Sequence, residues 1–300
     1  MKGGEMLGAG LAMALLATAT PAIMEQAGPH VLVGGSMATQ TLSYGADPKQ
    51  TVTLFTREKA ARPPLIVYLH GGGWSAGTPK AGYGGRQAEH WTSRGYAYAA
   101  TGYRFVPAAT VEQQLSDAAK AIALLRKQKG LDPDRIVLLG HSSGGHLAAM
   151  LGADPAWLEK AGVPFGAVKA VVLLDPAGLD IPPIMAIRGD GTIERYYRPA
   201  FGDDPARQST LSPMKQTEPP NAPAWLMLHD ANNPYAGAQS ADLAAALKGA
   251  GAREATVQAI AGTTHLRLND EIGQPGNEAT GLIEAFLARA LPENQRRRVR

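Results

Sequence analysis

The feature that most restricts the fold is an alternation of short apolar runs with helical patterns, which begins at about Thr51. Several runs are continuously apolar, as strands covered on both faces are. The predicted strands are TVTLF (51–55), LIVYLH (65–70), GYAYAATGY (95–103), RIVLLG (135–140), VKAVVLLD (168–175), AWLMLHD (224–230) and EATVQAI (254–260). Apolar residues at three- and four-residue spacings predict helices over 110–130, 144–152, 236–251 and 279–291. This pattern predicts an α/β fold: a mainly parallel sheet of about eight strands with helices on both faces.

One stretch interrupts the alternation. Residues 178–222 are rich in Pro, Gly and charged side chains, and we interpret them as a small cap-like insertion over the carboxyl edge of the sheet. Ligand sites of open α/β sheets lie at that edge. The expected organisation is therefore a single domain over residues 23–300 with this insertion inside it.

The first 22 residues differ from the rest of the chain. Lys2 precedes an apolar run from Met6 to Ala17, and small residues follow, which is the layout of a secretory signal peptide. The run is too short to span a bilayer comfortably. The alternative is an amphipathic first helix, because Glu5 is unusual in the charged region of a signal peptide. We expect export to the periplasm or beyond, without stable membrane insertion after the signal is removed.

Composition excludes several classes of function. The chain has no cysteine, which excludes disulfides, thiolate metal sites and a cysteine nucleophile. The formal net charge is only +3, and much of the positive excess lies in the terminal RRRVR, so a nucleic-acid partner is not indicated. No pair of histidines has metal-ligand spacing on a site-like loop, so no metal is expected. The sequence leaves the oligomeric state open.

The sequence GHSSG, from Gly140 to Gly144, lies between a predicted strand and a predicted helix. This is the G-x-S-x-G pattern of a nucleophile elbow, a turn so tight that the serine backbone is strained and its hydroxyl stands clear of the sheet. The small residues on either side avoid a clash. The alternative is an ordinary glycine-rich turn, but the strand–turn–helix context favours Ser142 as a nucleophile.

A second glycine-rich segment, YLHGGGW (68–74), also follows a predicted strand. An oxyanion needs N–H donors aimed at it, and glycines allow the backbone to approach that closely. We predict an oxyanion hole formed by the N–H groups of Gly72, Gly73 and Ser143. His70 is expected to hold the loop by hydrogen bonds. The segment is not a phosphate-binding loop, because no G-K-[ST] follows it.

These two motifs carry a family resemblance. HGGGW, followed about seventy residues later by GHSSGGHLA, resembles the α/β-hydrolase esterases with an HGGG loop. These are the hormone-sensitive-lipase-like, feruloyl-esterase-like and kynurenine-formamidase-like groups. The resemblance covers nearly all of residues 40–290. It implies an α/β-hydrolase fold and hydrolysis of esters or amides without a cofactor.

The resemblance also implies the chain order nucleophile, acid, histidine. Five of the seven histidines lie too early for that order: His30, His70, His90, His141 and His146. His229 ends a strand where the family usually has a structural His-Gly pair. His265 remains, just after the last predicted strand, as the base that takes the Ser142 proton and returns it to the leaving group.

The position of the acid departs from the family pattern. The relatives usually keep an aspartate in H-G-x-x-D, whereas this chain has HDANNPY, with Asn233 at that position. Asp175, which ends the preceding strand in LLDPAG, resembles the relocated acid of the pancreatic-type lipases. We prefer Asp175, with Asp230 as the alternative acid. Asn233, or no acid, is a third alternative. With Asp175 as the acid, Asn233→Asp is expected to leave activity unchanged or raise it, because it restores the relatives' acid on the adjacent strand end.

Three hypotheses follow. The first is a serine carboxylester hydrolase acting on a small-molecule ester through an acyl-enzyme, with Ser142, His265 and Asp175 as the triad. The second is an aryl-formamide or other amide hydrolase with the same machinery. The third is a non-catalytic binding protein on a hydrolase scaffold. Aromatic side chains that could line an acyl pocket, or simply pack, are Tyr196, Tyr197, Trp225 and Tyr235.

Overall fold

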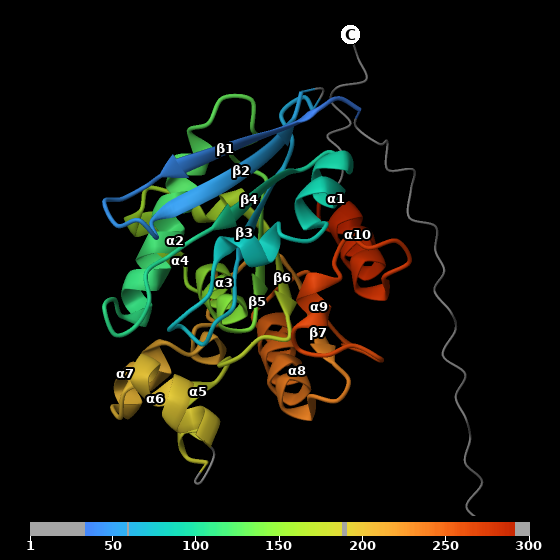
Figure 1. Ribbon diagram of the computed structural model, residues 1–300. Coiled ribbons are helices and arrows are strands. Elements are labelled where there is room, and N and C mark those ends of the chain that lie inside the picture. The colour runs from blue at the N-terminus through green and yellow to red at the C-terminus, as the bar shows by residue number, and fades with distance from the viewer. Residues whose placement is uncertain (1–33, 59, 188–190, 292–300) are drawn as a thin grey trace, which may run out of the picture.

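The computed structural model describes residues 34–58, 60–187 and 191–291, and the predicted signal peptide (1–22) lies outside them. The described chain contains an eight-stranded sheet in the order β1-β2-β4-β3-β5-β6-β7-β8 (Figure 1). The strands are β1 (Met37–Ser43), β2 (Thr51–Arg57), β3 (Leu65–Leu69), β4 (Ala97–Thr101), β5 (Ile136–His141), β6 (Val168–Leu174), β7 (Ala224–Asp230) and β8 (Glu254–Ile260). β1 and β2 pair in antiparallel fashion, as do β2 and β4, and the remaining pairs are parallel. The predicted fold class is confirmed.

Helices cover both faces of this sheet. They are α1 (Gln87–Ser93), α2 (Val111–Arg126), α3 (Ser143–Ala153), α4 (Pro155–Lys160), α5 (Ile181–Met185), α6 (Arg198–Phe201), α7 (Pro205–Thr210), α8 (Pro234–Gly249), α9 (Arg267–Asp270) and α10 (Glu278–Ala290). Figure 1 shows α2 and α4 on one side of the sheet and α1 and α10 on the other. The helices predicted over 110–130, 144–152, 236–251 and 279–291 correspond to α2, α3, α8 and α10.

The central strands are continuously apolar because both of their faces are buried. In β3, Leu65 and Val67 belong to the core on the side of α2, α3 and α8. The alternate residues Ile66 and Tyr68 belong to the core on the side of α1 and α10. Successive side chains of a strand point to opposite faces, so both sets need a covering layer of helices.

The edge strand β1 was not predicted from the sequence. Its residues, MATQTLS, are mostly exposed and contain no apolar run. The strand is held by its antiparallel register with β2, from Met37 opposite Arg57 to Ser43 opposite Thr51. Backbone pairing, and not burial, therefore defines this element.

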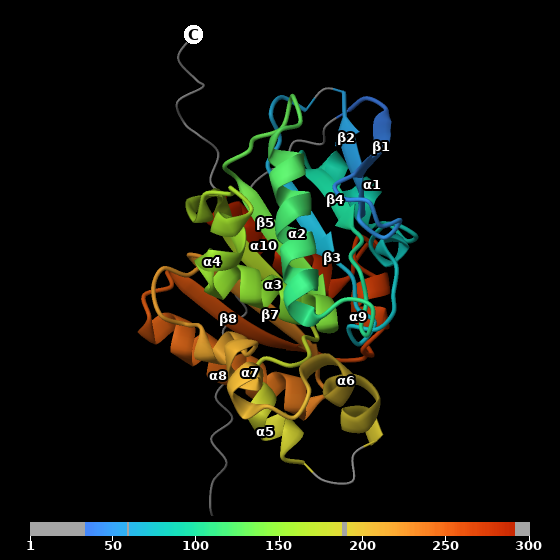
Figure 2. The same ribbon diagram turned by 90° about the vertical axis from the view of Figure 1, so that its left-hand side faces the viewer.

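The insertion between β6 and β7 carries α5, a π-helical turn η3 (Ile193–Tyr197), α6, α7 and a short 3₁₀ turn η4 (Pro213–Lys215). Figures 1 and 2 show α5, α6 and α7 together at one end of the molecule. The insertion is anchored on Trp74, whose ring contacts those of Tyr197 and Phe201 at centroid distances of 5.0 and 4.8 Å. It is also held by His146 in α3, whose Nε2 donates to the carbonyl of Leu211 at 2.7 Å.

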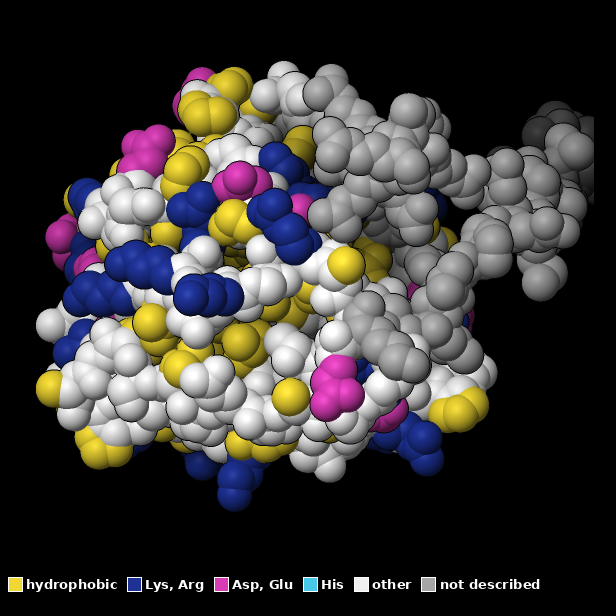
Figure 3. Space-filling view, turned by 90° about the horizontal axis from the view of Figure 1, so that it is seen from above, with side chains coloured by type: hydrophobic (Ala, Val, Ile, Leu, Met, Phe, Trp, Pro, Cys, Tyr) yellow, Lys and Arg dark blue, Asp and Glu magenta, His cyan; other side chains and the backbone are white. Residues whose placement is uncertain are grey.

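The end opposite the insertion is seen in Figure 3, where Lys and Arg side chains occur beside Asp, Glu and hydrophobic ones. This surface is therefore mixed in character. Within the described ranges, no helix combines the length and the apolarity needed to cross a bilayer.

Candidate active site

Ser142 lies at a strained corner between β5 and α3. Its backbone has φ 54° and ψ −123°, in the left-handed half of conformational space that a non-glycine residue enters at a cost of about 1–3 kcal/mol. A Cβ on Gly144 would overlap the carbonyl oxygen of Leu69, and one on Gly140 would overlap the carbonyl oxygen of Gly144. The two outer glycines of GHSSG are therefore required by close backbone packing, as a nucleophile elbow demands.

The loop Gly71–Gly73 lies directly against this corner. A Cβ on Gly71 would come within 3.0 Å of the Ser142 Cβ, which places the glycine loop in contact with the elbow. Gly72 and Gly73 have φ values of 134° and 59°, so both use backbone conformations that favour glycine. A Cβ on Gly73 would overlap the ring of Tyr196 from η3. The predicted oxyanion loop thus lies between the elbow and the insertion.

Two buried aromatic side chains, His70 and Tyr103, hydrogen-bond the backbone at the start of the glycine loop. His70 is fully buried, and its Nδ1 donates to the carbonyl of Gly71 at 2.7 Å. The hydroxyl of Tyr103 donates to the carbonyl of His70 at 2.5 Å, and the two rings stack at 4.3 Å. Burial lowers the pKa of His70 to about 4, so the ring is neutral near pH 7.

His265 and Asp175 form a hydrogen-bonded pair. The Nδ1 atom of His265 lies 2.6 Å from Oδ2 of Asp175. The Asp175 side chain has no solvent exposure, whereas that of His265 is 44% exposed. Because the carboxylate accepts a hydrogen bond from Nδ1–H, Nε2 is the ring atom left to act as a base. This is the pairing that a general base and its orienting acid require.

The Asp175 carboxylate is held by donors from the neighbouring strand end. It accepts hydrogen bonds from the backbone N–H of Asp230 at 3.2 Å and from Nδ2 of Asn233 at 3.1 and 3.3 Å. Burial alone raises the pKa of Asp175, but the hydrogen bonds from His265 and Asn233 outweigh it and hold the pKa below its usual range. The carboxylate is therefore charged at neutral pH.

The alternative acids have other partners. Asp230 accepts hydrogen bonds through Oδ1 from the backbone N–H and side-chain amide of Asn232, at 2.9 and 3.2 Å, and so stabilises its own turn. Asn233 donates to Asp175 and caps α8 through Oδ1, which accepts from the N–H of Ala236 at 3.1 Å. In the described structure, the ring of His265 is hydrogen-bonded to the side chain of Asp175 and not to that of Asp230 or Asn233.

His141, which directly precedes Ser142, was not identified by the sequence analysis as part of the site. Its Nε2 lies 2.8 Å from the carbonyl oxygen of His265, and the two rings are 4.6 Å apart. Burial, with a smaller effect from His265, lowers the pKa of His141 to about 4. The neutral ring donates this hydrogen bond, and it ties the His265 loop to the residue beside Ser142. The contact spans 124 positions, and no local sequence pattern signals it.

The other aromatic candidates divide into packing and site residues. Trp225 is fully buried and donates through Nε1 to the carbonyl of Ala222, and Tyr197 packs in the cluster around Trp74. Tyr235 is 44% exposed and accepts a hydrogen bond from Gln239. Of the four tyrosine and tryptophan candidates, Tyr196 is the one that lies against the glycine loop.

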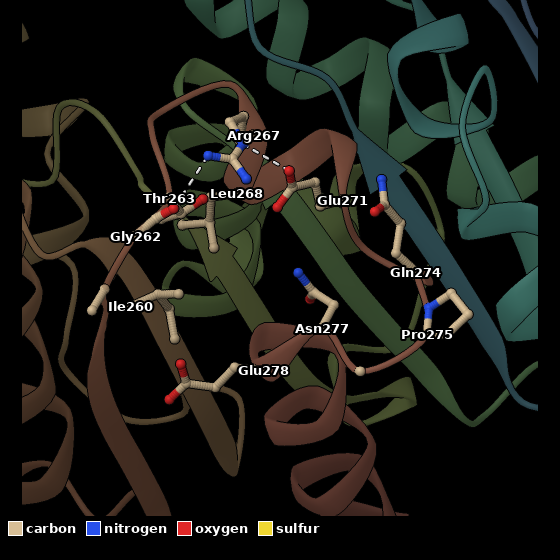
Figure 4. A pocket seen from close by; sticks show the side chains of 12 residues that line it. Ile260, Gly262, Thr263, Arg267, Leu268, Glu271, Gln274, Pro275, Asn277 and Glu278 are labelled. Atoms are coloured by element: carbon tan, nitrogen blue, oxygen red, sulfur yellow. Dashed lines mark hydrogen bonds and ion pairs between the residues drawn. The ribbon is translucent and has the colours of Figure 1, made fainter.

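A separate hollow of about 300 Å³ lies between the end of β8 and the start of α10 (Figure 4). Its lining is largely polar and includes Arg267, which donates to Glu271 and to the carbonyl of Gly262. Ser142, Asp175 and His265 are not among its lining residues. Within the described part of the chain, no group of three or more carboxylate or histidine side chains could hold a metal ion.

The sheet and the serine elbow together define an α/β-hydrolase fold. The model of the BD-FAE family matches residues 53–167, which include the glycine loop and the elbow. Thermogutta terrifontis esterase 2 phosphonylated by sarin is similar in structure, with a TM-score of 0.69 and 23% identity over 84% of this chain and 94% of that one. Its butyrate-bound form gives a TM-score of 0.67 at 24% identity, over 85% of this chain and 96% of that one.

Curated relatives point to the same class. A probable isoprenylcysteine alpha-carbonyl methylesterase of Oryza sativa subsp. japonica is 30% identical over 38% of this chain, and the match spans only 27% of the relative's length. A kynurenine formamidase of Salmo salar is 23% identical over 76% of this chain and 74% of the relative. The predicted resemblance to α/β-hydrolase esterases is confirmed.

Proposed function

We propose that this protein is a serine hydrolase that cleaves carboxylic esters. One observation carries the proposal. The buried Asp175 carboxylate bonds the ring of His265, and the loop of that histidine is bonded in turn to His141, next to the strained Ser142. A nucleophile elbow and a carboxylate-oriented imidazole are the two parts of an acyl-transfer triad.

In this mechanism, the Ser142 hydroxyl oxygen attacks the acyl carbon while Nε2 of His265 takes its proton. The charge on Asp175 stabilises the imidazolium that forms. The N–H groups of Gly72, Gly73 and Ser143 stabilise the tetrahedral oxyanion. Collapse breaks the ester C–O bond, and the imidazolium protonates the leaving alcohol. Water, deprotonated by His265, then attacks the acyl-enzyme and releases the acid, so no cofactor takes part.

We propose a short acyl group as the preferred one. Tyr196 lies against Gly73, so the insertion limits the space beside the oxyanion loop. The butyrate-bound form of the similar esterase supports the same size class. Amide or aryl-formamide hydrolysis is the second candidate, because the similarity to a kynurenine formamidase extends over 76% of this chain. Its chemistry would use the same residues.

The test is covalent labelling with a fluorophosphonate, together with hydrolysis of p-nitrophenyl esters of increasing acyl length and of an aryl formamide. We expect a single label on Ser142. Ser142→Ala should abolish both labelling and hydrolysis with nearly unchanged melting temperature, whereas the control Ser93→Ala in α1 should behave as wild type. Label on another residue of an active enzyme would refute the assignment. Faster turnover of the formamide than of any ester would favour the amidase.

We also propose export through the segment 1–22, on the strength of its charged start and short apolar run. The mature protein should begin near Ala22 or Ile23, or after Ala19, and be found outside the cytoplasm. Intact mass spectrometry of protein from the native host measures this directly. A cytosolic species that retains Met1 would contradict export.

A further inference from the structure

Asn233 occupies the position at which α/β-hydrolase esterases with an HGGG loop usually keep their acid. Two hydrogen-bonding contacts fix the orientation of its side-chain amide. Oδ1 faces the N–H of Ala236 at the start of α8, at 3.1 Å. Nδ2 faces both oxygens of Asp175, at 3.1 and 3.3 Å. The reverse orientation would set an amide oxygen against a carboxylate and an NH₂ against an N–H donor. The amide therefore has one compatible assignment.

We propose that Asn233 is a positioning residue that holds Asp175 ionised and directed at His265, so that two adjacent strand ends share the task of the acid. This role rests on the proposed hydrolase function. The end of β6 supplies the negative charge, and the turn after β7 supplies the donor that compensates for its burial. The Asp175 side chain is completely buried, and a buried carboxylate keeps its charge only when donors replace the lost water.

The backbone conformation of Asp175 is also unusual. This residue has φ 42°, an unfavourable conformation for a side chain that is not glycine. From this backbone position, the hydrogen bonds from Asn233 and from the N–H of Asp230 fix the direction of its carboxylate. Asn233 thus stabilises both the charge of the acid and its direction.

The arrangement also explains why aspartate at position 233 is unfavourable here. It would place a second carboxylate about 3 Å from the first, and two carboxylates at that distance do not both ionise in the same pH range. Other titratable residues near Asp175 are His265, which it bonds, His141, and Asp230, whose backbone N–H donates to it. The sequence-based expectation that aspartate at 233 would preserve or raise activity is therefore replaced by its opposite at neutral pH.

The experiment compares the rate at which a fluorophosphonate labels Ser142 in the full-length wild type, Asn233→Ala and Asn233→Asp. Labelling reports activation of the serine and needs no knowledge of the substrate. Asn233→Ala should slow it about 10- to 100-fold, which is the usual effect of losing a hydrogen bond to a charged group. Asn233→Asp keeps the helix cap. It should show an ionisation in its rate–pH profile that wild type lacks, with slower labelling above that pH.

Asn277→Ala and Asn277→Asp are matched controls. Asn277 caps α10 through Oδ1, which accepts from the N–H of Thr280 at 2.9 Å, so these variants reproduce the capping change away from Asp175. They should label at the wild-type rate, with a change in melting temperature similar to that of the Asn233 variants. Wild-type labelling in both Asn233 variants would overturn the role of Asn233 alone. An unlabelled wild type would overturn the hydrolase assignment and this role with it.

Discussion

Three buried histidines should make this protein sensitive to mild acid. Burial lowers the pKa of His70, His141 and His146 from 6.5 to about 4. In the folded state each ring uses one nitrogen as a donor to a backbone carbonyl. The other nitrogen of His146 accepts from Nε1 of Trp74 at 3.3 Å, so protonation would set two donors against each other.

The sign and the magnitude follow from these pKa values. Between pH 6.5 and about 4, the unfolded chain binds more protons at these histidines than the folded chain, so stability falls as the pH falls through this window. From pH 7 to pH 5, each histidine should reduce the free energy of unfolding by about 2 kcal/mol, and the three together by about 6 kcal/mol. That is a large part of the roughly 5–15 kcal/mol typical of a folded protein. The lowered pKa of Asp175 acts only below its ordinary value, outside this window.

Urea unfolding at pH 7 and pH 5 measures the effect directly. The midpoint should fall while the dependence of the free energy on urea stays constant, since the surface exposed on unfolding does not change. His146→Gln, which keeps a donor and an acceptor in place, should reduce the difference between the two pH values by about 2 kcal/mol, whatever its stability at pH 7. Equal stability of the wild type at both pH values would refute the reasoning.

The remaining predictions concern activity on a p-nitrophenyl ester. Asp175→Asn should lower kcat by about ten thousand-fold with little change in KM, because the charge acts mainly in the transition state, whereas Asp230→Asn should have a mild effect. The opposite order would move the acid to Asp230. His141→Ala should lower kcat about 10-fold by releasing the carbonyl of His265, and an unchanged kcat would show that this loop needs no such anchor. Tyr196→Ala should shift the preferred acyl length upwards across a series of chain lengths, and an unshifted preference would remove Tyr196 from the acyl pocket.

The features that could be predicted from the sequence are those for which burial requires a recognisable pattern of apolar residues. The central strands are recognisable because both of their faces are covered, as the alternation of Leu65 and Ile66 between the two cores shows. The strand β1 is stabilised by its partner's backbone, so its own composition gives no signal. The position of the insertion could be predicted from the sequence, but its helices could not. Its helices α5, α6 and α7 are short and depend on distant contacts such as those of Trp74.

The site divides in the same way. A strained serine turn and a close backbone approach both require glycines at fixed positions. The turn at Ser142 and the loop Gly71–Gly73 could therefore be predicted from the motifs GHSSG and HGGGW. The preference for Asp175 over Asp230 and Asn233 rests on the resemblance of LLDPAG and not on a local pattern, because all three residues lie at the carboxyl ends of the neighbouring strands β6 and β7. The choice among them depends on the conformation of each turn, which directs one carboxylate toward His265 and the other toward Asn232.

The proposed acid Asp175 is consistent with the path of the His265 loop. That loop leaves β8, whereas Ser142 leaves β5, three strand spacings or roughly 14 Å away across the sheet. An acid at the end of β7 would hold the imidazole beside β7, the neighbour of the strand β8 from which the His265 loop leaves. Asp175 on β6 holds the ring one strand closer to the nucleophile, and His141 on β5 holds the backbone of the same residue. In the proposed mechanism the base is therefore fixed from β5 and β6, which gives a mostly exposed loop the precise placement that proton transfer requires.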